Sequence, residues 1–219
     1  MTESTAAEQL PQKFEERKTP MSALTSSKFR VERPKDVKLW TRKECEFLVS
    51  SGMLDERFEL IEGEIILKMG QNRPHGITMR LIRKYLEQLF TADFMQIQEP
   101  VLVAYEDDEF NEPEPDLTVL EQPYMTYGKR KPGTGDVVLL VEISHTTMDR
   151  DTKSKPRLYA RADFPEYWVA DVEARQIWVY RSPSPNGYGV ITIYSETEEI
   201  SLISRPEEKI RVGDLFPSL

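Results

Sequence analysis

Two carboxylates lie beside apolar segments in which an unpaired charge would be costly. Asp116 ends the acidic stretch NEPEPD and leads into the strand-like run LTVL, and Glu142 lies inside the apolar run VVLLVEIS at 137–144. A buried carboxylate needs a cation or several hydrogen bonds, because its desolvation is otherwise unfavourable. If the two strands are neighbours, both acids lie at one end of a sheet, and two such oxygen ligands suit Mg2+.

Lys155 adds a positive group to this pair, because it follows Glu142 on the next predicted helix. A lysine beside a metal site can orient a water molecule or stabilise the negative charge that develops on a phosphoryl group. Two carboxylates and a lysine therefore favour hydrolysis of a phosphodiester bond.

Each of these residues also has a purely structural interpretation. Asp116 could cap the turn after Pro115. Glu142 could form a metal-free ion pair with Lys155 or Arg157. Lys155 could be an ordinary solvated residue on the surface of its helix.

The elements predicted around these residues form one α/β domain over residues 36–219, after a flexible polar tail over residues 1–35. Apolar spacing predicts helices that begin near Trp40, at His75 and near Thr152. Strand patterns predict a hairpin with its turn at Glu62–Gly63, strands over 95–105 and 115–120, a central strand over 136–144, and four strands after residue 165. These elements indicate a mixed sheet flanked by helices.

Composition limits the class of protein. The 219 residues carry a formal net charge of -9 and a single cysteine, Cys45. An acidic chain is not expected to coat nucleic acid non-specifically. We expect a cytoplasmic protein, because there is no secretory signal, no apolar run long enough to span a membrane and no disulfide framework.

A set of motifs resembles the Uma-two family of restriction-endonuclease-like proteins, within the PD-(D/E)XK nuclease superfamily. The resemblance extends from about Trp40 to the end of the chain. The motifs that carry it are FELIEGEI (58–65) followed by His75, Pro115-Asp116, Glu142-Ile143-Ser144, Asp151, Lys155, Tyr159-Ala160 and FPEYWVAD (164–171).

The resemblance implies a restriction-endonuclease-like fold and a site for Mg2+, with Mn2+ as an alternative. By position, Asp116 and Glu142 would be metal ligands, and Glu62 would be the extra acid that many members supply. His75 would accept a proton or contact a phosphate. The lysine of the (D/E)XK motif is replaced by Ser144, so the resemblance assigns its role to Lys155.

Three functions remain open at this point. The first is a metal-dependent DNA endonuclease, which we expect to act as a homodimer so that two sites can cut both strands. The second is an inactive nuclease fold kept for binding or as a scaffold, which the absent strand lysine favours. The third is hydrolysis of a small phosphoester, which suits a protein that repels long polyanions.

Overall fold

The computed structural model of the chain describes residues 36–68, 70 and 72–218. The tail predicted over residues 1–35 lies outside the described residues. No helix in the described part is both long enough and apolar enough to cross a membrane.

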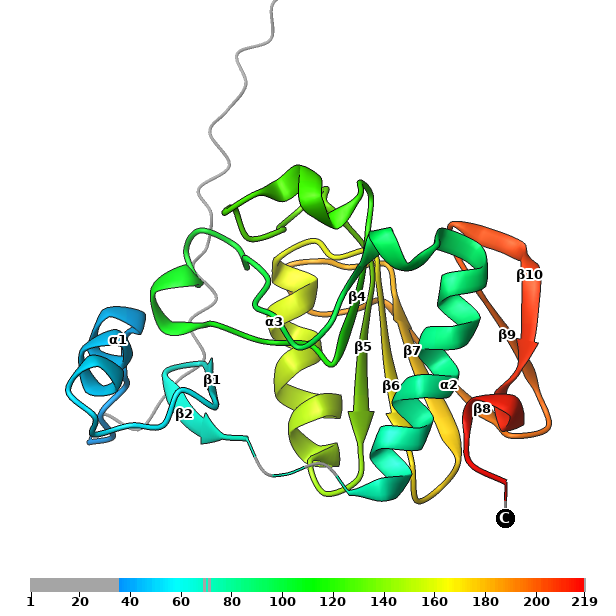
Figure 1. Cartoon of the computed structure of the whole chain (residues 1–219), viewed down its shortest axis with the longest axis horizontal. Helices are drawn as coiled ribbons and strands as arrows, with labels where there is room; N and C mark the ends of the chain where they lie inside the picture. Colours follow the sequence, from blue (N-terminus) through cyan, green and yellow to red (C-terminus); the bar gives the residue numbers. More distant parts are fainter. Residues whose placement is uncertain (1–35, 69, 71, 219) are drawn as a thin grey trace, which may run out of the picture. The chain divides into compact units, whose positions relative to one another are not determined.

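A six-stranded mixed sheet forms the centre of the domain (Figure 1). Its strands, in spatial order, are β3 (Met95–Gln96), β4 (Leu117–Leu120), β5 (Val137–Ser144), β6 (Glu166–Asp171), β7 (Gln176–Arg181) and β8 (Val190–Ser195). β5 and β6 are parallel, and the other neighbours are antiparallel. This arrangement confirms the predicted α/β fold with β5 as a central strand.

All eight residues of β5 are buried, because a helix covers each face of the strand. Leu139, Val141 and Ile143 pack in the same cluster as residues of α2 (Arg73–Phe90). Leu140 packs in a second cluster with residues of α3 (Lys155–Arg161). Because side chains alternate along a strand, Glu142 shares the α3 face with Leu140.

A single π-helical turn, η4 (Arg150–Ser154), leads into α3. The Lys155 N–H bonds to the Arg150 carbonyl, five residues earlier, instead of to the usual partner four residues earlier. Pro156 fits directly after this turn, since it lies at the first positions of α3. The helix predicted from about Thr152 is thus present, but its first turn is wider than an α-helix.

The remaining elements lie at the two sides of the sheet (Figure 1). Thr41 and Glu44 form a capping box for α1 (Arg42–Ser50). β1 (Phe58–Ile61) and β2 (Glu64–Leu67) form the predicted hairpin, in which Glu62 and Gly63 both have positive φ. A second hairpin joins β9 (Glu199–Leu202) to β10 (Arg205–Arg211). Short 3-10 helices are η1 (Ala92–Phe94), η2 (Asp108–Phe110), η3 (Tyr124–Tyr127) and η5 (Val212–Leu215).

Two sequence-based expectations about strands are wrong. The strand predicted over 95–105 is limited to Met95–Gln96, because the chain turns away at Pro100, which has no N–H to give to a ladder. Beyond it, Val101 and Val103 are still buried, and the Val101 N–H bonds to Pro113 outside any strand. After residue 165 the chain forms five strands and not four, since the charged segment RPEEKIR makes β10.

Candidate active site

Asp116 directly precedes β4, and Glu142 lies on the neighbouring antiparallel strand β5. Leu117 pairs with Val141 in the β4–β5 register, so the next pair outward is Asp116 with Glu142. Directly opposed residues have Cβ atoms about 4.5–5.5 Å apart. The Ile143 N–H also donates to Asp116 Oδ2 at 2.8 Å, which holds this carboxylate against β5. The structure therefore brings the two predicted acids together.

Asp116 is the more accessible of the two acids and favours the ionised form. It accepts hydrogen bonds from Gln98 Nε2 at 3.0 Å and lies 3.2 Å from His75 Nε2. Burial alone would raise its pKa, but His75, the Ile143 N–H and Gln98 together lower the pKa below its ordinary value. Its side chain keeps 14% of its exposure, so a ligand can reach the carboxylate.

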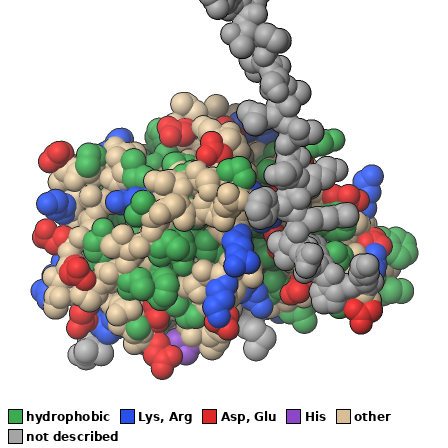
Figure 2. All heavy atoms as spheres, turned by 180° about the vertical axis from the view of Figure 1, so that it is seen from behind, with side chains coloured by type: hydrophobic (Ala, Val, Ile, Leu, Met, Phe, Trp, Pro, Cys, Tyr) green, Lys and Arg blue, Asp and Glu red, His purple; other side chains and the backbone are tan. Residues whose placement is uncertain are grey.

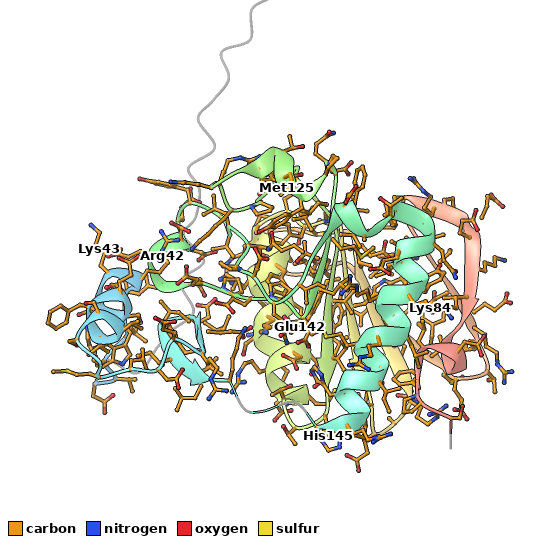
Figure 3. The ribbon with its side chains drawn as sticks, viewed as in Figure 1. Arg42, Lys43, Lys84, Met125, Glu142 and His145 are labelled. Atoms are coloured by element: carbon orange, nitrogen blue, oxygen red, sulfur yellow. The ribbon has the colours of Figure 1, made fainter. Side chains whose placement is uncertain are left out.

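Glu142 is buried between β5 and α3, near the middle of the view in Figure 3. Lys155 Nζ donates to Glu142 Oε1 at 2.7 Å, and the Tyr159 hydroxyl donates to the same oxygen at 3.1 Å. Burial raises the pKa of Glu142 well above its ordinary value, although the charge of Lys155 acts against this shift. Glu142 is thus an acid that binds a proton more readily than a solvated glutamate does.

Lys155 contacts three carboxylates from three parts of the chain. Its Nζ lies 2.7 Å from Glu142, 2.9 Å from Glu59 on β1 and 3.8 Å from Asp151 on η4. Burial would lower the pKa of Lys155, but these carboxylates raise it well above its ordinary value, so the lysine is charged. Burial likewise raises the pKa of Asp151. One ammonium thus faces three carboxylates, more than its single charge can neutralise.

The π-helical turn places Asp151 and Lys155 on the buried side of the segment. The Thr147 hydroxyl donates to the Asp151 carboxylate and lies 3.2 Å from the Ser144 hydroxyl. Asp151, which is one of the motif residues of the family resemblance, is therefore part of the buried network around Lys155.

Of the two remaining predicted residues, His75 lies beside Asp116 and Glu62 lies away from Lys155. His75 is held at the start of α2, where its N–H bonds to the Asn72 side chain, and its ring lies against Asp116. Glu62 is hydrogen bonded to the guanidinium of Arg161, at the far end of α3 from Lys155. The acid that contacts Lys155 from the β1–β2 hairpin is Glu59, which sequence reasoning did not select. Its signal was available, since Glu59 is a charged residue between Phe58 and Leu60 in a predicted strand.

The site offers two carboxylates to a hard divalent cation, but it does not enclose the ion with protein ligands. Within residues 36–68, 70 and 72–218, no group of three or more His, Cys, Asp or Glu side chains is arranged to enclose a metal ion. Mg2+ does not need such an enclosure, because it is commonly held by one or two carboxylates, several waters and a substrate phosphate. Asp116 and Glu142 match that donor set. The ammonium of Lys155 already shows that Glu142 attracts a cation.

Replacing Tyr159 with phenylalanine should lower the free energy of unfolding by about 1–3 kcal/mol, because a buried carboxylate loses a hydrogen-bond donor. Urea denaturation followed by circular dichroism measures this change. Tyr105→Phe is the matched control, since that ring is 92% exposed. Equal stability of the two variants would show that the Tyr159 hydroxyl does not stabilise Glu142.

Comparison with known proteins identifies the family and the fold of the chain. The model of the Uma2 family, described as "Putative restriction endonuclease", matches residues 49–208. No curated protein matches the chain. A solved structure from Anabaena variabilis, described as a "putative nuclease belonging to DUF820", is similar over 77% of this chain and 96% of its own, with 16% identity and a TM-score of 0.57. That identity is too low to compare functions, so the likeness concerns the fold.

Proposed function

Because the chain belongs to the Uma2 family of putative restriction endonucleases, we propose that it is a metal-dependent endonuclease that hydrolyses phosphodiester bonds in DNA. The observation that carries the proposal is the opposition of Asp116 and Glu142 across β4 and β5, with Lys155 beside Glu142. Two carboxylates that can serve as oxygen ligands, and the buried ammonium of Lys155, thus lie near one end of the inner strands β4 and β5. A purely structural ion pair between Glu142 and Lys155 would not require an Asp116 carboxylate that favours the ionised form.

Asp116 and Glu142 would hold Mg2+, or alternatively Mn2+. When bound, such an ion lowers the pKa of a water molecule and neutralises charge on the phosphate. Glu142 must give up its proton to act as a ligand, and its carboxylate must exchange Lys155 for the ion. The raised pKa of Glu142 opposes this step, so the ion must compete with both the proton and Lys155, and metal binding should release protons to the solvent.

Lys155 takes the role of the lysine that Ser144 replaces in the (D/E)XK motif. Its Nζ already lies 2.7 Å from Glu142, although it comes from the helix after the strand. Once released from Glu142, the ammonium can donate hydrogen bonds to a non-bridging phosphate oxygen, where negative charge develops in the transition state. Glu59 and Asp151 keep the ammonium near this position.

His75 is suited to accept a proton or to contact the phosphate. Its Nε2 lies 3.2 Å from Asp116, and its Nδ1 is buried without a hydrogen-bond partner among the described residues. An unpaired ring nitrogen costs free energy, so a group that bonds to it would be favoured. We therefore keep His75 in the proposed site.

We further propose that the protein acts as a homodimer in the cytoplasm. A two-fold dimer would let two sites cut both strands of one DNA duplex. The single cysteine, Cys45, is buried and unpaired, which suits a reducing compartment.

Glu59, and not Glu62, is our choice for the acid that supports the site from the first hairpin. Glu59→Gln should lower the cleavage rate by about 10–100-fold, the usual range for groups that orient a metal site from behind. Glu62→Gln should retain the rate, because its carboxylate bonds to Arg161. The opposite order of the two rates would restore Glu62 to the role that the family resemblance gave it.

Conversion of supercoiled plasmid to nicked and linear forms tests the proposed function. We expect conversion with Mg2+ or Mn2+ and none with a chelator. A protein that binds DNA without cutting it would be a nuclease fold kept for binding. A protein that hydrolyses mononucleotide esters and leaves the plasmid intact would be a small-phosphoester hydrolase.

A further inference from the structure

A pocket lies at the surface, where the chain leaves β5, the strand that carries Glu142. It has a volume of about 330 Å³ and is lined by Thr146, Thr147, Asp149, Arg150, Lys153 and Ser154. All six residues belong to the segment that joins β5 to α3. His145, which precedes this segment, lies at the lower end of the domain in Figure 3, while Glu142 lies deeper. The pocket therefore lies beside the candidate active site and outside it.

Two cations and two hydroxyls give this pocket the chemistry of an anion site. Of the residues that the structure describes, none forms an ion pair with Arg150. Lys153 Nζ lies 2.7 Å from Asp149, but that carboxylate is 90% exposed and can move away at little cost. The arginine fork and the hydroxyls of Thr146 and Ser154 match the oxygens of a phosphate group, while the Thr147 hydroxyl donates to Asp151.

The wide first turn before α3 connects the pocket to the candidate active site. Arg150 and Lys153 face the pocket, while Asp151 and Lys155 face the buried network. Thr147 belongs to both, because it lines the pocket and its hydroxyl donates to Asp151, which contacts Lys155. π-Helical turns are frequent at functional sites, and here one turn separates the two sets of charges.

Three other basic residues, Arg83, Arg130 and Lys131, fit a phosphate contact less well. They form ion pairs with Glu87, Asp136 and Glu112. The face seen in Figure 2 has acidic and basic side chains intermixed, without a broad positive surface. A protein with a net charge of -9 must therefore contact a polyanion through a small number of local sites.

We propose that this pocket binds a backbone phosphate of the nucleic acid next to the phosphate that is cleaved. Arg150 and Lys153 hold the same phosphate, and the hydroxyls complete its contacts. This contact fixes the strand so that the neighbouring phosphate lies at Asp116 and Glu142, because backbone contacts set the register of a duplex on a protein. The inference rests on the proposed function, since it requires a nucleic-acid substrate.

The test is the salt dependence of binding to a fluorescent DNA duplex, with Ca2+ in place of Mg2+ and the duplex verified as uncut. For Arg150→Ala/Lys153→Ala, the slope of log Kd against log salt concentration should fall by about 1, the value for one lost phosphate contact. A fall of about 2 would mean two separate contacts and would contradict the shared phosphate. The control is Lys43→Ala on α1, which is exposed and lies far from Glu142 in Figure 3.

A third variant separates this proposal from a general effect of charge or folding. Asp149→Asn removes the carboxylate that competes for Lys153, so it should tighten DNA binding in the wild-type chain and have little effect in the double variant. Equal tightening in both backgrounds would show that only net charge matters and would overturn the proposal.

The failures of the two proposals are distinguishable. If the wild-type protein binds no DNA, the proposed function fails and this inference fails with it. If the wild-type protein binds DNA and the double variant matches Lys43→Ala, the inference alone fails. At constant ionic strength, inorganic phosphate at millimolar concentration should weaken duplex binding more for the wild-type protein than for the double variant, because phosphate and duplex compete for the pocket; equal weakening of the two would contradict the inference.

Discussion

Replacing Asp116 with asparagine is expected to lower metal-dependent DNA cleavage by more than about 100-fold. Loss of groups that only orient metal ligands costs about 10–100-fold, and loss of a ligand should cost more. Asparagine keeps one oxygen for the Ile143 N–H, so the contact that holds residue 116 against β5 can persist. The measurement is the initial rate of plasmid nicking at saturating Mg2+, together with circular dichroism to verify the fold.

Glu112→Gln is the matched control for this substitution. It removes an acid from the same NEPEPD segment, but the Glu112 carboxylate pairs with Lys131. We expect this variant to cleave at nearly the wild-type rate. Equal rates for the wild-type protein and Asp116→Asn would show that Asp116 is not a metal ligand in the reaction.

Replacing Lys155 with methionine should lower the free energy of unfolding by about 3–5 kcal/mol at neutral pH. Removing one partner of a buried ion pair leaves its charge uncompensated. Here the loss affects both Glu142 and Asp151, and within the described part of the chain Lys155 is the cation that contacts them. Urea denaturation measures the change, and Lys84→Met, an exposed lysine on α2, should change stability by less than about 0.5 kcal/mol.

The deficit of Lys155→Met should become smaller as the pH falls. Burial raises the pKa of Glu142 above 4.5 and that of Asp151 above 3.8, so the folded state binds protons more tightly than the unfolded state. The stability that such groups contribute is fully present below these ordinary values and is lost as the pH rises through the folded pKa. Without Lys155, only the hydrogen bonds from Tyr159 to Glu142 and from Thr147 to Asp151 offset this loss at neutral pH. A deficit that does not change with pH would contradict this account of the two buried acids.

Much of the candidate site could be predicted because its residues conflict with their local surroundings. Glu142 interrupts an apolar strand, and Asp116 enters the next strand from an acidic segment. Adjacent strands of an α/β domain then place the two acids near each other, and the β4–β5 register puts residue 116 next to Glu142. Lys155 was selected from the order of motifs, and in the structure it forms with Glu142 the metal-free ion pair that was the structural alternative for these residues.

Residues of the site that depend on tertiary packing could not be predicted as directly. Glu59 and Glu62 lie three positions apart in one hairpin, and the approach of β1 to α3 decides which of them contacts Lys155. No local pattern encodes that approach. The same limit applies to the π-helical turn, since the added residue is recognised only from the bond between the Lys155 N–H and the Arg150 carbonyl.

The strand errors have a related cause. β10 has the sequence RPEEKIR, and most of its residues are exposed, so it lacks the alternation that marks a half-buried strand. It forms because β9 supplies a partner. Conversely, VLVAY has the composition of a strand but pairs with no strand. The N–H groups of Val101 and Leu102 bond to the carbonyls of Pro113 and Pro132, and both valines are buried without belonging to the sheet.

The central claim is that Asp116 and Glu142 together hold a divalent cation. A crystal soaked in millimolar Mn2+ and measured at the manganese absorption edge tests it most directly. The account predicts an anomalous scattering peak within bonding distance of one oxygen of each carboxylate, with Lys155 Nζ withdrawn from Glu142. A crystal soaked in the same way that shows no anomalous peak between the two acids, and in which Lys155 still bonds to Glu142, would contradict it.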